Sequence, residues 1–155
     1  MILTEGPMEV PVAHTLRQEV RAVLEGLPAT TSEDLTGARS RYTDLAVDDP
    51  GLRDRLVAVA APLSGAPDPA TVRVRRHDVG DFTLPHRVGD VVAGHWSLTF
   101  PLDDSEVDGV TAWVDERFER VLDRAGTGLL LAPGSWAWVS PVRGAPRYSV
   151  VMGVR

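Results

Sequence analysis

Histidine carries most of the acid–base and metal-binding capacity of this sequence, and three of its four copies fall in one short segment. The four are His14, His77, His86 and His95. The stretch LPHRVGD is typical of a strand around His86, and residues two apart in a strand share a face. An imidazole and a carboxylate separated by one residue form a bidentate clip for Fe(II), yet Val88 stands where that carboxylate would be. The segment holds either a lone histidine or a site with other ligands.

His86 and His95 are candidate general acid–base residues, because an imidazole pKa of about 6.5 suits proton transfer at neutral pH. A rebuilt metal set of His86, Asp90 and His95 is the alternative. Val-Gly-Asp at 88–90 has the composition of a turn, which would carry Asp90 away from the strand face. We therefore expect no metal site. Lysine and cysteine are absent, which excludes Schiff-base and thiol nucleophiles.

The composition predicts one globular domain of 155 residues, with 43% hydrophobic and 25% charged residues. A net charge of −6 argues against nucleic acid as a partner. The one local basic cluster, Arg73, Arg75 and Arg76, is expected to be solvated. With no cysteine, no signal-peptide pattern and no apolar run of membrane-spanning length, the protein is expected to be cytoplasmic and to have no membrane partner.

Hydrophobic spacing divides the chain into a helical part, residues 1–70, and a β-rich part, residues 71–155. Apolar residues at helical intervals between Val12 and Leu27 predict a first helix, and Asp49 with Pro50 marks the start of a second. The polar stretch at 30–50 between them is interpreted as a loop. From Thr71 onward, short alternating runs separated by Gly and Pro predict a sandwich or barrel of strands.

The β-rich part resembles the 2-oxoglutarate/Fe(II)-dependent oxygenases, in particular their prolyl-hydroxylase-like branch. The segments that carry the likeness, in order, are VGDFTLPHRVGD, SLTFPLDDSEVDGVTAWV, GTGLLLAPGSWAWVSPV and GAPRYSVVMGV. The resemblance implies a mainly β fold, a double-stranded β-helix (jelly roll), here with two flanking N-terminal α-helices. It also implies a cavity in which a His-x-Asp pair and a distal His would hold iron.

Carried over position by position, the resemblance leaves the iron site incomplete. His86 matches the first ligand, whereas Val88 occupies the Asp position and Ala137 that of the distal His. Arg147 and Ser149 match the pair that would grip the far carboxylate of 2-oxoglutarate. Val88 and Ala137 would then line a drier substrate pocket. Arg147 either binds an anion there or pairs with an acidic side chain of the protein itself.

Two tryptophans flank Ala137, so if Ala137 faces the pocket, Trp136 and Trp138 should face away from it. Packing in the core is the favoured interpretation of these rings, and a contact between the subunits of a homodimer is the alternative.

Three functions are consistent with this pattern. The first is an enzyme that has lost iron and performs redox-neutral chemistry, such as isomerisation, cyclisation, elimination or hydrolysis, on a carboxylate-bearing small molecule of secondary metabolism. His86 or His95 would then move protons, while Arg147, Ser149, Val88 and Ala137 contact the substrate, with no cofactor. The second is an oxygenase that uses Fe(II) and 2-oxoglutarate with unusual ligands. The third is a noncatalytic pseudo-oxygenase that acts by binding.

Overall fold

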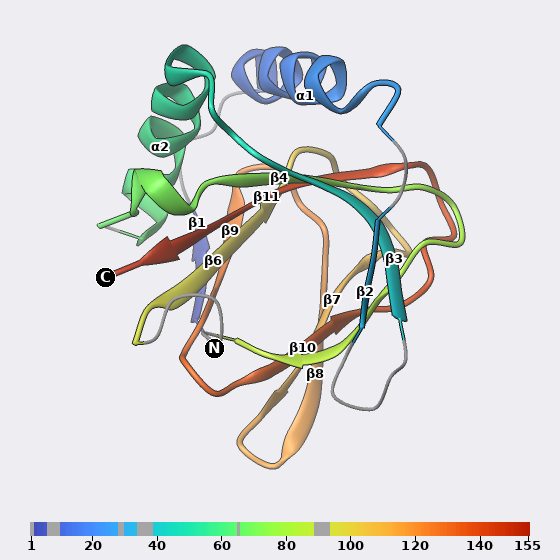
Figure 1. Ribbon diagram of the computed structural model, residues 1–155. Coiled ribbons are helices and arrows are strands. Elements are labelled where there is room, and N and C mark those ends of the chain that lie inside the picture. The colour runs from blue at the N-terminus through green and yellow to red at the C-terminus, as the bar shows by residue number, and fades with distance from the viewer. Residues whose placement is uncertain (1, 6–9, 28–29, 34–38, 65, 89–93) are drawn as a thin grey trace.

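A computed structural model describes residues 2–5, 10–27, 30–33, 39–64, 66–88 and 94–155 (Figure 1). Two helices, α1 (Val10–Leu24) and α2 (Pro50–Ser64), lie on one side of a body of strands. A short 3-10 turn, η1 (Pro69–Thr71), leads into the β-rich part. No helix in the described ranges has the length and apolar character needed to cross a membrane.

Two antiparallel sheets form the body. The large sheet has the order β1-β9-β6-β11-β4-β3-β2 and the small sheet the order β5-β10-β7-β8. The strands are β1 (Ile2–Glu5), β2 (Thr30–Glu33), β3 (Arg39–Ala46), β4 (Arg73–His77), β5 (Thr83–Arg87), β6 (Trp96–Pro101), β7 (Gly109–Val114), β8 (Arg117–Leu122), β9 (Thr127–Leu131), β10 (Trp136–Val139) and β11 (Arg147–Val154). The eight strands β4 to β11 make up the expected double-stranded β-helix, and the predicted fold class is confirmed.

Both helices form where the sequence predicts them and cover the outer face of the large sheet (Figure 1). Leu16, Val20 and Leu24 of α1 are buried, and Gly26 ends that helix with a φ of 76°, which favours glycine. At the start of α2, the backbone N–H of Leu52 donates to Oδ2 of Asp49 at 3.0 Å, as an N-cap requires.

The molecule has two hydrophobic cores, one on each side of the large sheet. The first lies between that sheet and the helices, where Val74, Phe100 and Val150 are fully buried. The second, smaller core lies between the two sheets and includes Val88 and Ala137. Alternate residues of β4, β6 and β11 therefore face the helices, and the residues between them face the small sheet.

The N-terminal seventy residues are not only helical, as the sequence had suggested. The stretch taken for a loop contains β2 and β3, and β1 adds a further strand to the large sheet by pairing with β9. β3 was missed because both of its faces carry polar side chains, among them the buried Ser40 and Thr43, so the strand shows no apolar alternation. Its partner β4 lies far away in sequence and supplies the pairing.

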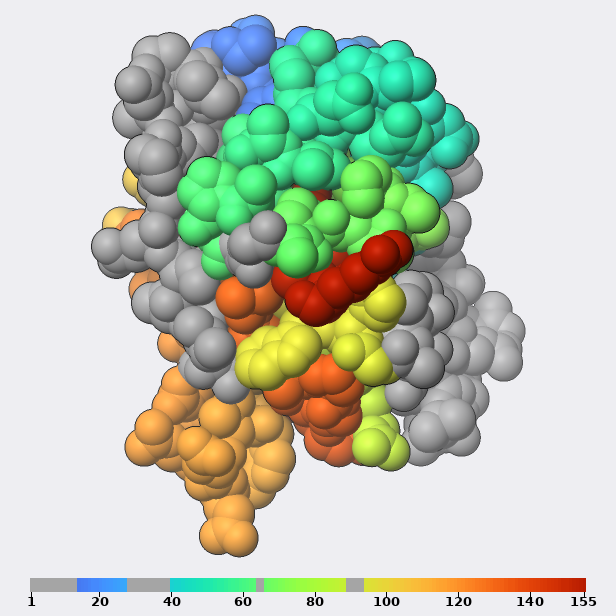
Figure 2. Space-filling model, turned by 90° about the vertical axis from the view of Figure 1, so that its left-hand side faces the viewer, coloured from blue at the N-terminus to red at the C-terminus, as the bar shows by residue number. Residues whose placement is uncertain are grey.

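The β7–β8 hairpin projects from the body (Figure 2). Its tip turns at Asp115 and Glu116, whose φ angles of 49° and 64° fit a two-residue hairpin turn. Behind the tip, the ring of Phe118 contacts those of Trp113 and Trp138 at centroid distances of 4.4 and 5.2 Å. Trp136, 40% exposed, is not a core residue, because it lies on the face of β10 opposite to buried Ala137.

Candidate functional site

A cavity of about 170 Å³ opens between the two sheets. All the sequence-predicted site residues line it, namely His86, Val88, His95, Ala137, Arg147 and Ser149. They come from β5, β10, β11 and the segments beside β5 and β6, which antiparallel pairing brings together although they span more than sixty positions. Asp90, the alternative ligand, lies outside the described residues.

The three positions expected for iron ligands meet at one wall of this cavity. Ala137 of β10 lies directly opposite His86 of β5 in the ladder. Val88 follows on the same side, and its backbone N–H donates to the carbonyl of Ser135 at 2.8 Å. Val88 and Ala137 are 5% and 3% exposed, whereas His86 is exposed at the rim.

This donor set does not fit Fe(II). Iron in such a site needs two imidazoles and a carboxylate, or an equivalent set of hard and borderline donors. Here two of the three positions, Val88 and Ala137, have aliphatic side chains with no donor atom. A single imidazole competes poorly with water for the coordination of Fe(II). In the described ranges, no group of three His, Asp or Glu side chains is placed to hold a metal ion.

The imidazole of His86 has a defined tautomer. Its Nδ1 lies 3.0 Å from the carbonyl oxygen of Leu84. Since a carbonyl oxygen only accepts, Nδ1 carries the proton, and Nε2 is the basic atom of the neutral ring. His86 can therefore accept a proton through Nε2 at the rim of the cavity.

Arg147 is bound to an acidic side chain of the protein itself. Its Nε donates to Oδ2 of Asp123 at 2.7 Å and its Nη2 to Oδ1 at 3.1 Å, while Nη1 donates to Oγ of Ser149 at 3.2 Å. The two charged side chains are 5% and 6% exposed. Burial raises the pKa of the Asp123 carboxyl, and the Arg147 charge and hydrogen bonds oppose that shift. The sequence interpretation left this pairing open as the alternative to anion binding.

The inward face of β4 supplies functional residues that the sequence analysis assigned to solvent. Arg73 and Arg75 line the cavity together with His77, two residues further along the same face. Both arginines share the carboxylate of Asp44 on β3, with contacts of 2.6 and 3.1 Å. The alternation R-x-R-x-H was the available signal. It was missed because a polar strand face normally indicates solvent, whereas here it faces a polar cavity.

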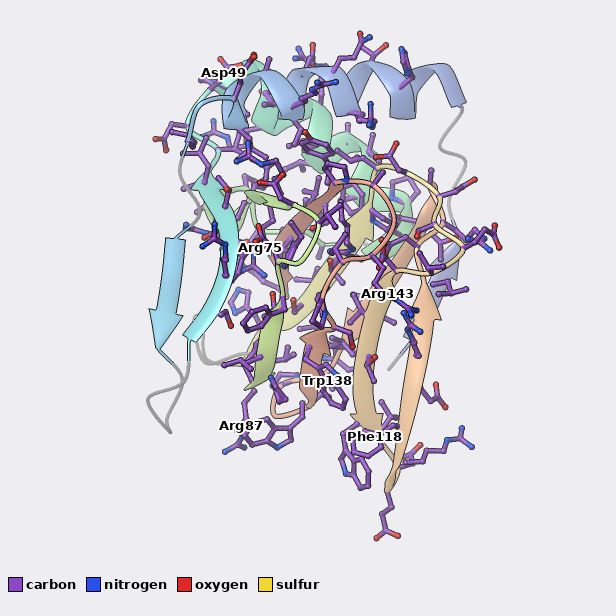
Figure 3. The ribbon with its side chains drawn as sticks, turned by 90° about the vertical axis from the view of Figure 1, so that its right-hand side faces the viewer. Asp49, Arg75, Arg87, Phe118, Trp138 and Arg143 are labelled. Atoms are coloured by element: carbon purple, nitrogen blue, oxygen red, sulfur yellow. The ribbon has the colours of Figure 1, made fainter. Side chains whose placement is uncertain are left out.

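Arg75 is the best-placed guanidinium for a ligand. Its side chain is 21% exposed, its Nε is held by Asp44, and its guanidinium lies 5.1 Å from the centroid of the Tyr42 ring. Within the described ranges its two terminal nitrogens have no hydrogen-bond partner. Figure 3 shows Arg75 beside β3, with Arg87 and Trp138 toward the end of the molecule remote from α1.

His77 is a buried, neutral imidazole in the wall of the cavity. It is 1% exposed, its Nε2 lies 2.8 Å from Oγ1 of Thr83, and its ring stacks on Tyr42 at 5.2 Å. Its Nδ1 is buried and has no hydrogen-bond partner among the residues that the structure describes. Burial lowers the pKa of His77 well below its ordinary value, and the charges of Arg147 and Arg75 lower it further.

His95 lies at the opposite wall, beside the large sheet. Its Nε2 is 3.5 Å from Oδ2 of Asp68, a charge contact that is too poorly aligned to count as a hydrogen bond. Oδ1 of Asp68 also accepts a hydrogen bond from the backbone N–H of Ala70. This hydrogen bond is the main reason that the pKa of Asp68 is lowered. His95 therefore faces a carboxylate at this wall of the cavity.

The fold and site together define a class of protein, a double-stranded β-helix whose central cavity is basic and in which the described residues do not provide a complete set of iron ligands. No protein-family model and no curated protein sequence matches the chain. Solved structures share its fold. SnoN, a non-heme alpha ketoglutarate dependent epimerase from nogalamycin biosynthesis, has a TM-score of 0.71 at 14% identity, covering 99% of this chain and 76% of its own.

Two further structures agree. A prolyl-4-hydroxylase of Pseudomonas putida has a TM-score of 0.68 at 15% identity, covering 99% of this chain and 91% of its own. SnoK, a non-heme alpha ketoglutarate dependent carbocyclase, has a TM-score of 0.63 at 14% identity, covering 99% and 79%. The predicted resemblance is confirmed for the fold: the chain has the fold of the 2-oxoglutarate/Fe(II) oxygenases, with a degenerate set of residues at the iron positions.

Proposed function

We propose that the cavity binds a small carboxylate-bearing molecule and that the protein transforms it by metal-independent, redox-neutral chemistry. The observation that carries this proposal is the charge of the lining. Four arginines and three histidines line the cavity, and no Asp or Glu side chain does so among the described residues. The lining residues with these side chains are Arg73, Arg75, Arg87, Arg147, His77, His86 and His95.

The surplus of positive charge supports an anionic ligand. Asp44 and Asp123 lie behind the lining and neutralise part of it, but four guanidinium groups outnumber the two carboxylates paired with them. A guanidinium in a partly dehydrated cavity binds a carboxylate through charge-assisted hydrogen bonds. Arg75, with its terminal nitrogens free of described partners, is the main proposed anchor, and Ser149 adds a hydroxyl.

The volume sets the size of the bound group. A cavity of about 150 Å³ holds a benzene ring, so a cavity of about 170 Å³ accommodates a ring with a carboxylate. The apolar wall of Val88 and Ala137 suits the ring, and the basic wall of β4 suits the carboxylate. A larger substrate extends past His86 at the rim.

Proton transfer is the chemistry that the lining supports without a metal. Nε2 is the basic atom of the neutral His86 ring, and His95 lies on another wall of the cavity, 3.5 Å from Asp68. Two imidazoles on different walls can remove a proton from one side of a bound molecule and return one on the other. Isomerisation, cyclisation, elimination and hydrolysis can all proceed through such proton transfers without net oxidation. SnoN and SnoK are named as an epimerase and a carbocyclase of nogalamycin biosynthesis, and both names also state a dependence on alpha ketoglutarate, which this proposal replaces by proton transfer alone.

Ligand-induced stabilisation tests the proposal with benzoate and benzamide, which have the same shape but differ in charge. At tenfold excess over Kd, benzoate should stabilise the protein by about 1.4 kcal/mol, a rise in Tm of about 3–5 °C. Benzamide and an equal ionic strength of chloride should leave Tm unchanged. Equal shifts for benzoate and benzamide would contradict an anion site.

Arg75→Gln tests the anchor. Asp44 keeps Arg73 as its partner in this variant, so the fold is maintained while the benzoate shift falls to less than a third. The matched control is Arg41→Gln, because the Arg41 side chain is 64% exposed and does not line the cavity. Unchanged benzoate binding in Arg75→Gln would remove Arg75 from the site.

A further inference from the structure

Asp123 and Arg147 form the most deeply buried ion pair at the cavity. The pair is bidentate, with Nε to Oδ2 at 2.7 Å and Nη2 to Oδ1 at 3.1 Å, and both side chains are about 95% buried. Fork-to-fork pairing of this kind is the geometry in which a guanidinium recognises a free carboxylate. The recognition edge of Arg147 is therefore filled by a carboxylate of the same chain.

The backbone holds Asp123 in place. Its N–H donates to the carbonyl of Asp108, and its carbonyl accepts from the N–H of Ser105, each at 3.0 Å. The carbonyl also accepts from Nη1 of Arg124. With its main chain anchored on both sides, Asp123 can leave Arg147 only by rotation of its buried side chain, which would break both hydrogen bonds to the guanidinium. The pair is thus a fixed part of the fold.

The pair lies at the junction of two spaces. Arg147 lines both the main cavity and a small adjoining pocket of about 20 Å³, and Asp123 lines the small pocket alone. The carboxylate reaches the guanidinium from behind, on the side away from the main cavity. Truncation of Asp123 would enlarge the small pocket beside the guanidinium by the volume of a carboxyl group.

We propose that Asp123 is a built-in carboxylate that occupies the anion site of Arg147, so that this protein does not take up 2-oxoglutarate. Removal of that carboxylate turns Arg147 into a binding site for a small external carboxylate. The co-substrate that the fold family uses is then excluded by the chain itself, in addition to the missing iron donors. The inference concerns Arg147 alone and does not depend on the proposed reaction or on Arg75.

Chemical rescue tests the proposal. In Asp123→Ala the buried guanidinium loses its partner, and Tm should fall by about 10 °C. Acetate at 100 mM should recover at least a third of that loss, because it supplies the missing carboxylate, whereas acetamide at the same concentration and ionic strength should recover none. A rescue by acetate no larger than that by acetamide would overturn the proposal.

Asp81→Ala is the matched control. Asp81 is also buried, at 4% exposure, but the side chain of its partner Arg41 is 64% exposed, so its loss leaves a solvated cation. Acetate should not rescue this variant. Equal rescue of both variants would mean a general salt effect and would count against the proposal.

Protein that keeps Asp123 provides an arm that does not depend on the folding of Asp123→Ala. The protein titrated is Arg75→Gln, in which the proposed carboxylate anchor is removed and Asp123 and Arg147 are intact. Addition of 2-oxoglutarate to 5 mM should change neither its Tm nor the heat measured by calorimetry. Binding that is lost in Arg147→Met would overturn the proposal. If Asp123→Ala is recovered only unfolded, refolding from urea in acetate against acetamide gives the same comparison. Failure of the benzoate test alone would leave this result unaffected.

Discussion

At the scale of single residues, the cavity combines fixed positive charges with one imidazole that is held neutral. His77 is enclosed by Tyr42, Thr83 and the charges of Arg75 and Arg147, none of which favours a proton on the ring. In the sequence analysis, His77 was only one of three histidines in a short segment and had no assigned role. Its burial and its partners are set by the β4–β11 pairing, in which it lies opposite Arg147.

The lowered pKa of His77 makes stability depend on pH. When the pH falls below the unfolded value of about 6.5, the unfolded chain binds a proton that the folded chain refuses, so stability is lost on acidification. Between pH 7.5 and 5.5 this one group should cost about 1.4 kcal/mol of unfolding free energy.

His77→Phe isolates this contribution in urea unfolding at the two pH values. The variant keeps an aromatic ring against Tyr42 but has no titrating group at this position. From pH 7.5 to 5.5, its unfolding free energy should therefore fall by about 1.4 kcal/mol less than that of the wild type. An identical pH dependence in both proteins would show that the pKa of His77 is the same in the folded and unfolded states, which would contradict the prediction.

At the scale of elements, the β7–β8 hairpin depends on a close approach of backbone. A Cβ placed on Gly109 would clash with the backbone carbonyl oxygen of Val121. Because the clashing atom belongs to the backbone, a change of side-chain rotamer cannot relieve the clash. Gly51, near the start of α2, is different. A Cβ there meets only side-chain atoms at 3.7 Å or more, and its φ is not in the left-handed region.

Two alanine substitutions should therefore have opposite signs. Gly109→Ala should destabilise by about 3 kcal/mol or more through this steric clash, and Gly51→Ala should stabilise by up to about 0.5 kcal/mol through helix propensity. Urea unfolding of both variants measures the difference. A neutral Gly109→Ala would mean that the hairpin pairs in another register.

At the scale of the whole molecule, the large sheet is the shared wall of two cores. Its outer face, with Val74, Phe100 and Val150, is covered by α1 and α2. Arg76 of β4 also donates to the carbonyl of Leu24 at the end of α1, at 2.8 Å, and to that of Leu27 just beyond it, at 3.0 Å. The helical part and the β-rich part therefore act as one folding unit.

A fragment of residues 66–155 should not fold by itself. It keeps all eight strands of the double-stranded β-helix but exposes the apolar face that the helices cover, and it loses the pairings of β1 and β3. We expect no cooperative thermal transition in circular dichroism and strong binding of a hydrophobic dye. A cooperative transition in the fragment would show that residues 1–65 are dispensable for the fold.

The sequence alone determined the class of fold, both helices and six of the residues that line the cavity. Apolar spacing is a local property, so α1 and α2 could be located, and the order of four segments was enough for the β-helix. His86, Val88 and Ala137 were placed together because strand alternation and chain order determine which side chains face inward. The absence of a carboxylate at position 88 and of an imidazole at 137 is visible without any structure.

Only the tertiary structure decided what the charged residues do. Asp123 and Arg147 are 24 positions apart, and Asp44 and Arg75 are 31 apart; no local pattern pairs them. β3 was taken for a loop, and the arginines of β4 for solvated residues, because a polar strand face that lines a cavity has the same composition as one that faces water. Charge pairing depends on distance in space, which the chain sets only after it has folded.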